Sequence, residues 1–85
     1  MTSMTNAEKI ELLNNVVFEL HKNTYTNCLK LGIDPETLNT ETHNPEEFIS
    51  LFSKNPHDHI ACVVINRNIA NLVAANKKLD ELNNV

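Results

Sequence analysis

Glycine is almost absent from this chain of 85 residues, which also has three prolines, two cysteines and no tryptophan. Phosphate-binding loops and tight β-hairpin turns both need glycines. The lone Gly32 therefore argues against P-loop and dinucleotide-binding fingerprints, and against a fold made of hairpins. The remaining candidates are helical folds with longer connections.

Long apolar runs and basic stripes are also missing. No run approaches the about 18 residues that indicate a membrane-spanning helix. The first residues lack the basic region and apolar block of a secretory signal. We therefore expect a cytoplasmic protein that does not enter a membrane, in which Cys28 and Cys62 are reduced thiols. The formal net charge of −4 argues against a nucleic-acid polymer as partner.

The composition fits one small folded domain over residues 1–85, with residues 1–4 disordered. Hydrophobic residues make up 41% and charged residues 21% of the chain, as in globular domains. A chain this short buries only about 60–65% of its unfolded surface, so its core is thin. Such domains often gain stability from a metal, a disulfide or a partner subunit.

Each proline follows Asp or Asn, in DPET (34–37), NPEE (44–47) and NPHD (55–58). The Asx side chain accepts a hydrogen bond from an orphan backbone N–H, and proline at the first helical position loses no bond. Thr5 with Glu8 fits a capping box, and Gly32 suits a helix end. The chain is therefore predicted to be all-α, with helices at about 6–31, 45–54 and 56–83 and a connector at 33–44.

Apolar residues alternate by three and four along both long helices, which predicts that they pack as two antiparallel helices. In the last helix this seam consists of Cys62, Ile65, Ile69, Leu72, Asn76 and Leu79. Asn76 would fix the register or the oligomeric state. Other apolar residues lie outside the seams, namely Leu12, Val16, Phe18, Tyr25, Leu29, Ile60, Val63 and Val64. We therefore expect an oligomer that completes a helical bundle.

The densest group of chemically reactive residues is NPHDHIAC, at 55–62. His59 and Cys62 share a helix face and are minor candidates for zinc ligands. The spacing matches no established zinc motif, however, and a seam cysteine most often packs as a small apolar residue. Pairing of a histidine with a cysteine as a nucleophile lacks a third orienting group. No metal, cofactor or catalytic residue is predicted.

Arg67, Asn71 and Lys78 share a helix face away from the seam and are the candidate ligand-binding residues. A guanidinium beside amides can grip a carboxylate or a phosphate with two hydrogen bonds. The plainer interpretation is a surface arginine paired with Glu11, Glu19 or a neighbouring subunit.

Two functions fit this sequence. The first is a non-enzymatic helical oligomer that binds or inhibits another protein, as a regulator, an adaptor or a phage-type inhibitor. The second is an oligomer that sequesters a small anionic ligand, such as a cyclic nucleotide, in pockets between its subunits. The expected partners are thus further copies of the chain, another protein and, in the second case, the anion.

Overall fold

The computed structural model describes residues 3–84, which form three α-helices and one 3₁₀ turn, with no strand among them. The elements are α1 (Asn6–Leu31), η1 (Pro35–Thr37), α2 (Pro45–Phe52) and α3 (Pro56–Asn83). The all-α prediction is confirmed. The middle helix ends two residues before its expected end at 54. Over residues 3–84, no helix has both the length and the apolar character to cross a membrane.

The α-helices begin with the capping hydrogen bonds that the sequence predicts. Thr5 Oγ1 accepts from the Glu8 backbone N–H at 3.2 Å, and the Glu8 carboxylate accepts from the Thr5 N–H at 3.2 Å. Asn44 and Asn55 cap α2 and α3 through their side-chain oxygens. Gly32 ends α1 at φ 72°, a left-handed conformation that suits glycine best. Residues 1 and 2 of the segment expected to be disordered lie outside the described residues, and Ser3 and Met4 are exposed.

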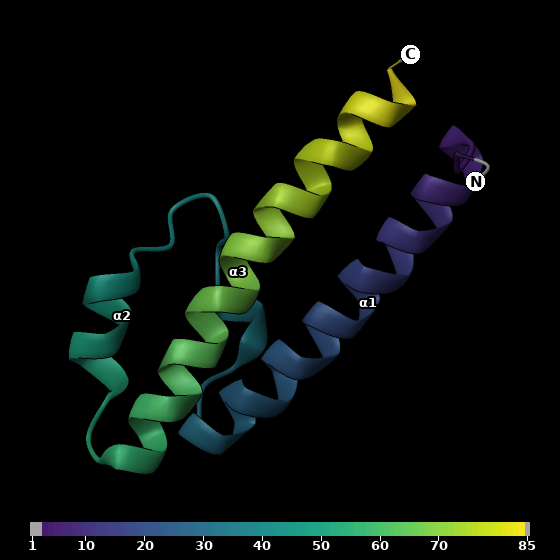
Figure 1. Cartoon of the computed structure of the whole chain (residues 1–85). Coiled ribbons are helices and arrows are strands. Elements are labelled where there is room, and N and C mark those ends of the chain that lie inside the picture. Colours follow the sequence, from purple (N-terminus) through teal and green to yellow (C-terminus); the bar gives the residue numbers. More distant parts are fainter. Residues whose placement is uncertain (1–2, 85) are drawn as a thin grey trace.

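The long helices α1 and α3 lie side by side, and the chain's two termini lie at the same end of the pair (Figure 1). The molecule is elongated, with extents of 48 × 23 × 21 Å. The connector runs behind α3 in Figure 1, and α2 packs on the flank of α3 away from α1. One side of the α1–α3 pair is thus covered by a third layer.

The core lies where this third layer meets the two long helices. Cys28, Cys62 and Ile65 have no exposed surface, and Phe48 of α2 is 5% exposed. Leu38 and Phe52 pack against them from the connector and α2. Toward the termini, Ile10, Leu13 and Leu79 are only half-buried. Burial of a Leu or Ile side chain is worth about 1.5–3 kcal/mol, so most apolar stabilisation lies at the end that the connector and α2 cover.

The row of α3 residues nearest α1 differs from the predicted seam. Four predicted members, Cys62, Ile65, Ile69 and Leu72, are buried, Leu79 is half-buried, and Asn76 is exposed. The buried row with four–three spacing continues through Asn68 and Ala75 instead. Cys62, Ile65 and Ile69 belong to one cluster with Cys28 of α1 and Phe48 of α2. The predicted seam was wrong at Asn76 because two adjacent flanks of α3 are both buried, so its apolar residues do not mark a single row.

Candidate functional site

A pair of asparagines joins α1 to α3 in the middle of the molecule, and a third asparagine bonds to the pair within α1. Asn68 Nδ2 donates to Asn23 Oδ1 at 2.8 Å. Asn27 Nδ2 donates to the Asn23 backbone oxygen at 2.9 Å and lies 3.3 Å from its Oδ1. Asn27 and Asn68 are 7% and 6% exposed. Because a slip of one helix along the other would break this partly buried bond, the Asn23–Asn68 pair fixes the register of the two helices.

A hollow of about 490 Å³ lies next to these asparagines, on the side of the pair away from the connector. It is lined by Asn15, Val16, Glu19, Leu20, Asn23 and Asn68. The connector reaches the opposite side, where Pro35, Leu38 and Thr40 meet Tyr25, Ile69 and Leu72. The hollow is therefore part of a surface that no other described element covers.

We define the open face as the rows of residues, at seven-residue spacing, that flank this hollow. On α1 they are Lys9, Val16, Asn23 and Lys30, with Leu12, Glu19 and Thr26 beside them. On α3 they are His57, Val64, Asn71 and Lys78, with Ile60, Arg67, Ala74 and Glu81 beside them. All are exposed except Val64, which is half-buried.

The three candidate ligand-binding residues lie on this face. Arg67, Asn71 and Lys78 are all exposed on α3. Within residues 3–84 one salt bridge forms, between Lys78 and Glu81 at 3.7 Å. Arg67 thus pairs with neither Glu11 nor Glu19 inside the described chain. Its expected pairing with a neighbouring subunit stays a prediction. Its guanidinium remains available to a ligand or partner.

A second exposed surface lies on α1, away from the open face, and at Tyr25 it borders the connector. Phe18 is 65%, Tyr25 46% and Leu29 70% exposed. Together with Lys22 they recur at four–three–four spacing, so they form one line along the helix. We call Phe18, Tyr25 and Leu29 the outer stripe. Seven of the eight apolar residues expected outside the seams are exposed in the single chain, the exception being half-buried Val64.

The connector is held to α3 by a histidine and an asparagine. Asn66 Nδ2 donates to the Pro45 backbone oxygen at 3.2 Å, so its Oδ1 is left to accept. His43 Nε2 lies 2.6 Å from that Oδ1 and must therefore carry the proton that it donates. The His43 ring also packs on Phe48, with the centroids 5.1 Å apart.

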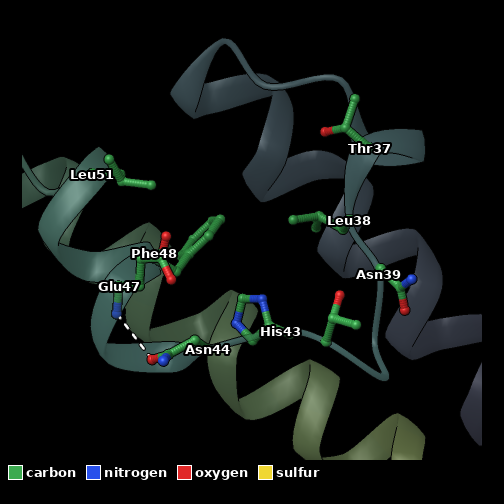
Figure 2. A pocket seen from close by; sticks show the side chains of 9 residues that line it. Thr37, Leu38, Asn39, His43, Asn44, Glu47, Phe48 and Leu51 are labelled. Carbon is green, nitrogen blue, oxygen red and sulfur yellow. Dashed lines mark hydrogen bonds between the residues drawn. The ribbon is translucent and has the colours of Figure 1, made fainter.

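A hollow of about 210 Å³ opens beside His43 (Figure 2). Leu38 and Phe48 point toward one another across it, from the connector and α2, and Asn39, Asn44 and Glu47 lie at its rim. The Asn44 and Glu47 pair in Figure 2 is the α2 cap, at 3.1 Å. The Asn44 side chain therefore already serves the local fold.

The predicted minor metal candidates differ in burial. Cys62 is fully buried, whereas His59 is exposed and its Nδ1 lies 3.1 Å from Ser53 Oγ. Among residues 3–84, no group of three metal-binding side chains comes together. Burial raises the pKa of both Cys28 and Cys62, and the Asp58 carboxylate raises that of Cys62 further. Both changes favour the neutral thiol over the reactive thiolate.

Comparisons of the chain with family models, curated proteins and solved structures found no match. The arguments for function therefore rest on the chain's own residues. Sequence reasoning identified the Arg67 face but missed the Asn23–Asn68 and His43–Asn66 pairs, which are 45 and 23 residues apart. One available signal was Asn68, an amide at a four–three position between Ile65 and Leu72.

Proposed function

We propose that this chain is a non-enzymatic interaction protein that works as an oligomer and binds or inhibits another protein. In the proposed assembly α1 and α3 are an antiparallel pair, and a second copy completes a helical bundle. The observation that carries the proposal is the outer stripe, where two of three large apolar side chains are more than 60% exposed. Contiguous apolar surface of this kind marks interaction sites.

The outer stripe suits a second copy because it is nearly symmetric along its length. Phe18 and Leu29 lie at its two ends, with Tyr25 and Lys22 between them. If two α1 helices cross in opposite directions, Phe18 of each copy meets Leu29 of the other, and Lys22 meets Tyr25. This contact is isologous and closes as a dimer, while Lys22 and Tyr25 can form a cation–π pair.

The proposal is tested by light scattering on the wild type and on Phe18→Asp, with Leu51→Asp as a matched control. Leu51 is 58% exposed but lies on α2, away from the outer stripe. We expect an oligomer for the wild type and the control and a single chain for Phe18→Asp. A wild type that is monomeric at high micromolar concentration overturns the proposal.

The second candidate function is sequestration of a small anion, such as a cyclic nucleotide, between subunits. It is favoured by the unpaired, exposed guanidinium of Arg67, which shares its face with Asn71 and Lys78. Thermal unfolding with cyclic di- and trinucleotides tests it. We expect a rise in Tm that is lost in Arg67→Ala and retained in Lys77→Ala. No rise with any nucleotide argues against this function.

A further inference from the structure

The open face carries a charge opposite to that of the whole chain. It holds four of the seven lysine and arginine residues, Lys9, Lys30, Arg67 and Lys78, against the two acids Glu19 and Glu81. Glu81 already lies 3.7 Å from Lys78. The chain as a whole has a formal net charge of −4. The connector and α2, which cover the other side of the pair, contribute acids at 34, 36, 41, 46 and 47 and one base, Lys54.

This separation of charge argues against a second copy on the open face. An isologous contact brings a surface against itself, so two faces with excess lysine and arginine would meet. Like charges held together across an interface cost several kcal/mol. The outer stripe, which has Lys22 as its basic residue, carries no such excess, and it is the surface that we assign to the second copy. The open face is thus left for a partner of opposite charge.

The groove between α1 and α3 has the features needed to seat a helix. Val16 and Leu20 supply apolar surface in the hollow, while Asn15, Asn23 and Asn68 offer amides there. Leu12 and Val64 add apolar surface elsewhere on the open face. Lys9 and Lys30 are 21 residues apart on α1, which corresponds to about 32 Å along the helix axis. A helix of about 20 residues matches this length, with its apolar side in the groove and its acids beside the basic residues.

We propose that the open face binds an acidic amphipathic helix of a partner protein. The inference rests on the proposed interaction function and names the surface and the chemistry of the partner. The apolar side of the bound helix fills the hollow beside Val16. Its carboxylates pair with Arg67 and Lys30, and Arg67 is free to make two parallel hydrogen bonds to one carboxylate.

The test uses three synthetic amphipathic helical peptides with the same leucine side and with glutamate, glutamine or lysine at the flanking positions. Their binding to the full chain is measured by fluorescence anisotropy at low and at physiological salt. We expect the glutamate peptide to bind at least about tenfold more tightly than the lysine peptide, with the difference shrinking as salt rises. Amide chemical shifts should change at Val16, Asn23 and Asn71 and not at Phe18 or Leu29.

Charge-reversal variants test whether the glutamate peptide binds to the open face. Lys30→Glu with Arg67→Glu should weaken binding of the glutamate peptide by about tenfold or more. The control pair Lys54→Glu with Lys77→Glu makes the same change of charge at exposed residues outside both the open face and the outer stripe, and should leave binding within about twofold.

Several outcomes overturn the inference. Equal binding of the glutamate and lysine peptides, equal loss in both variant pairs, or shift changes confined to the outer stripe each contradict it. A change of oligomer mass in Lys30→Glu with Arg67→Glu would assign the face to a second copy instead. An oligomeric wild type that binds none of the peptides removes this inference and leaves the proposed oligomer intact.

Discussion

The two ends of the α1–α3 pair differ in how well their apolar side chains are covered. At the capped end, which we define as residues 24–31 of α1 and 61–72 of α3, Cys28, Cys62 and Ile65 are fully buried. At the bare end, residues 6–20 and 73–83, Leu13 and Leu79 are half-buried. The helices have the same kind of seam at both ends, so the difference comes from the third layer. Two helices alone cannot enclose a core, and we propose that another chain covers the bare end.

The largest effect should come from truncating the seam at the capped end. Ile65→Ala leaves a cavity among fully buried side chains and should cost about 3 kcal/mol of unfolding free energy. Leu13→Ala at the bare end should cost about 1 kcal/mol, because its side chain is already half exposed. Urea unfolding of dilute protein checks the pair, and equal losses would contradict the division into two ends.

Loss of the asparagine pair between the two ends should have the next largest effect. Asn68→Ala removes the donor to Asn23 inside the α1–α3 contact and should cost about 1–2 kcal/mol. Asn76→Ala is the matched control, since Asn76 is exposed, and should change stability by less than about 0.5 kcal/mol. Urea unfolding distinguishes them. A larger loss for Asn76→Ala would show that its side chain is buried in an assembly.

The hydrogen bonds between the connector and α3 should contribute part of the greater stability of the capped end. Asn66→Ala removes its bonds to His43 and Pro45 and should cost about 1 kcal/mol. Hydrogen exchange should accelerate mainly in α2. Uniform acceleration along α1 would mean that the third layer and the helix pair unfold together.

The helix caps offer a smaller contrast between the ends. Asn55→Ala removes the cap of α3 beside the third layer and should cost about 1 kcal/mol, whereas Thr5→Ala at the bare end should cost about 0.5 kcal/mol. Thermal unfolding checks both, with Thr26→Ala as an exposed control outside any cap. A larger loss of stability in Thr5→Ala than in Asn55→Ala would contradict the division, because it would make the bare end the more stable one.

The fold could be predicted from the sequence because its signals are local. Thr5 with Glu8, Asn44 with Pro45, and Asn55 with Pro56 each mark a helix start within four residues. The side-chain pairs Asn23–Asn68 and His43–Asn66 could not, since they depend on how distant segments meet. The same limit explains Asn76, which continues the row of Cys62 and Ile69 beyond the core cluster and is exposed. Which exposed residues are used in binding depends on partners outside the chain.

The smallest effect concerns the two thiols of the capped end. Burial raises the folded-state pKa of Cys28 above its ordinary value near 9.0. The folded state therefore favours the neutral thiol. The contribution of Cys28 to the unfolding free energy is complete below the unfolded-state pKa and is lost as pH rises through the folded-state pKa. Unfolding free energy should decline above about pH 9, and less steeply in Cys28→Ala. An identical decline in both proteins would assign it to other groups.

The central claim is that the bare end and the outer stripe are completed by another copy of the chain, and mass in solution tests it most directly. Light scattering across a concentration series should give the mass of two or more chains for the wild type and for Leu51→Asp, and of one chain for Phe18→Asp. A wild type with the mass of one chain at high micromolar concentration would contradict the account.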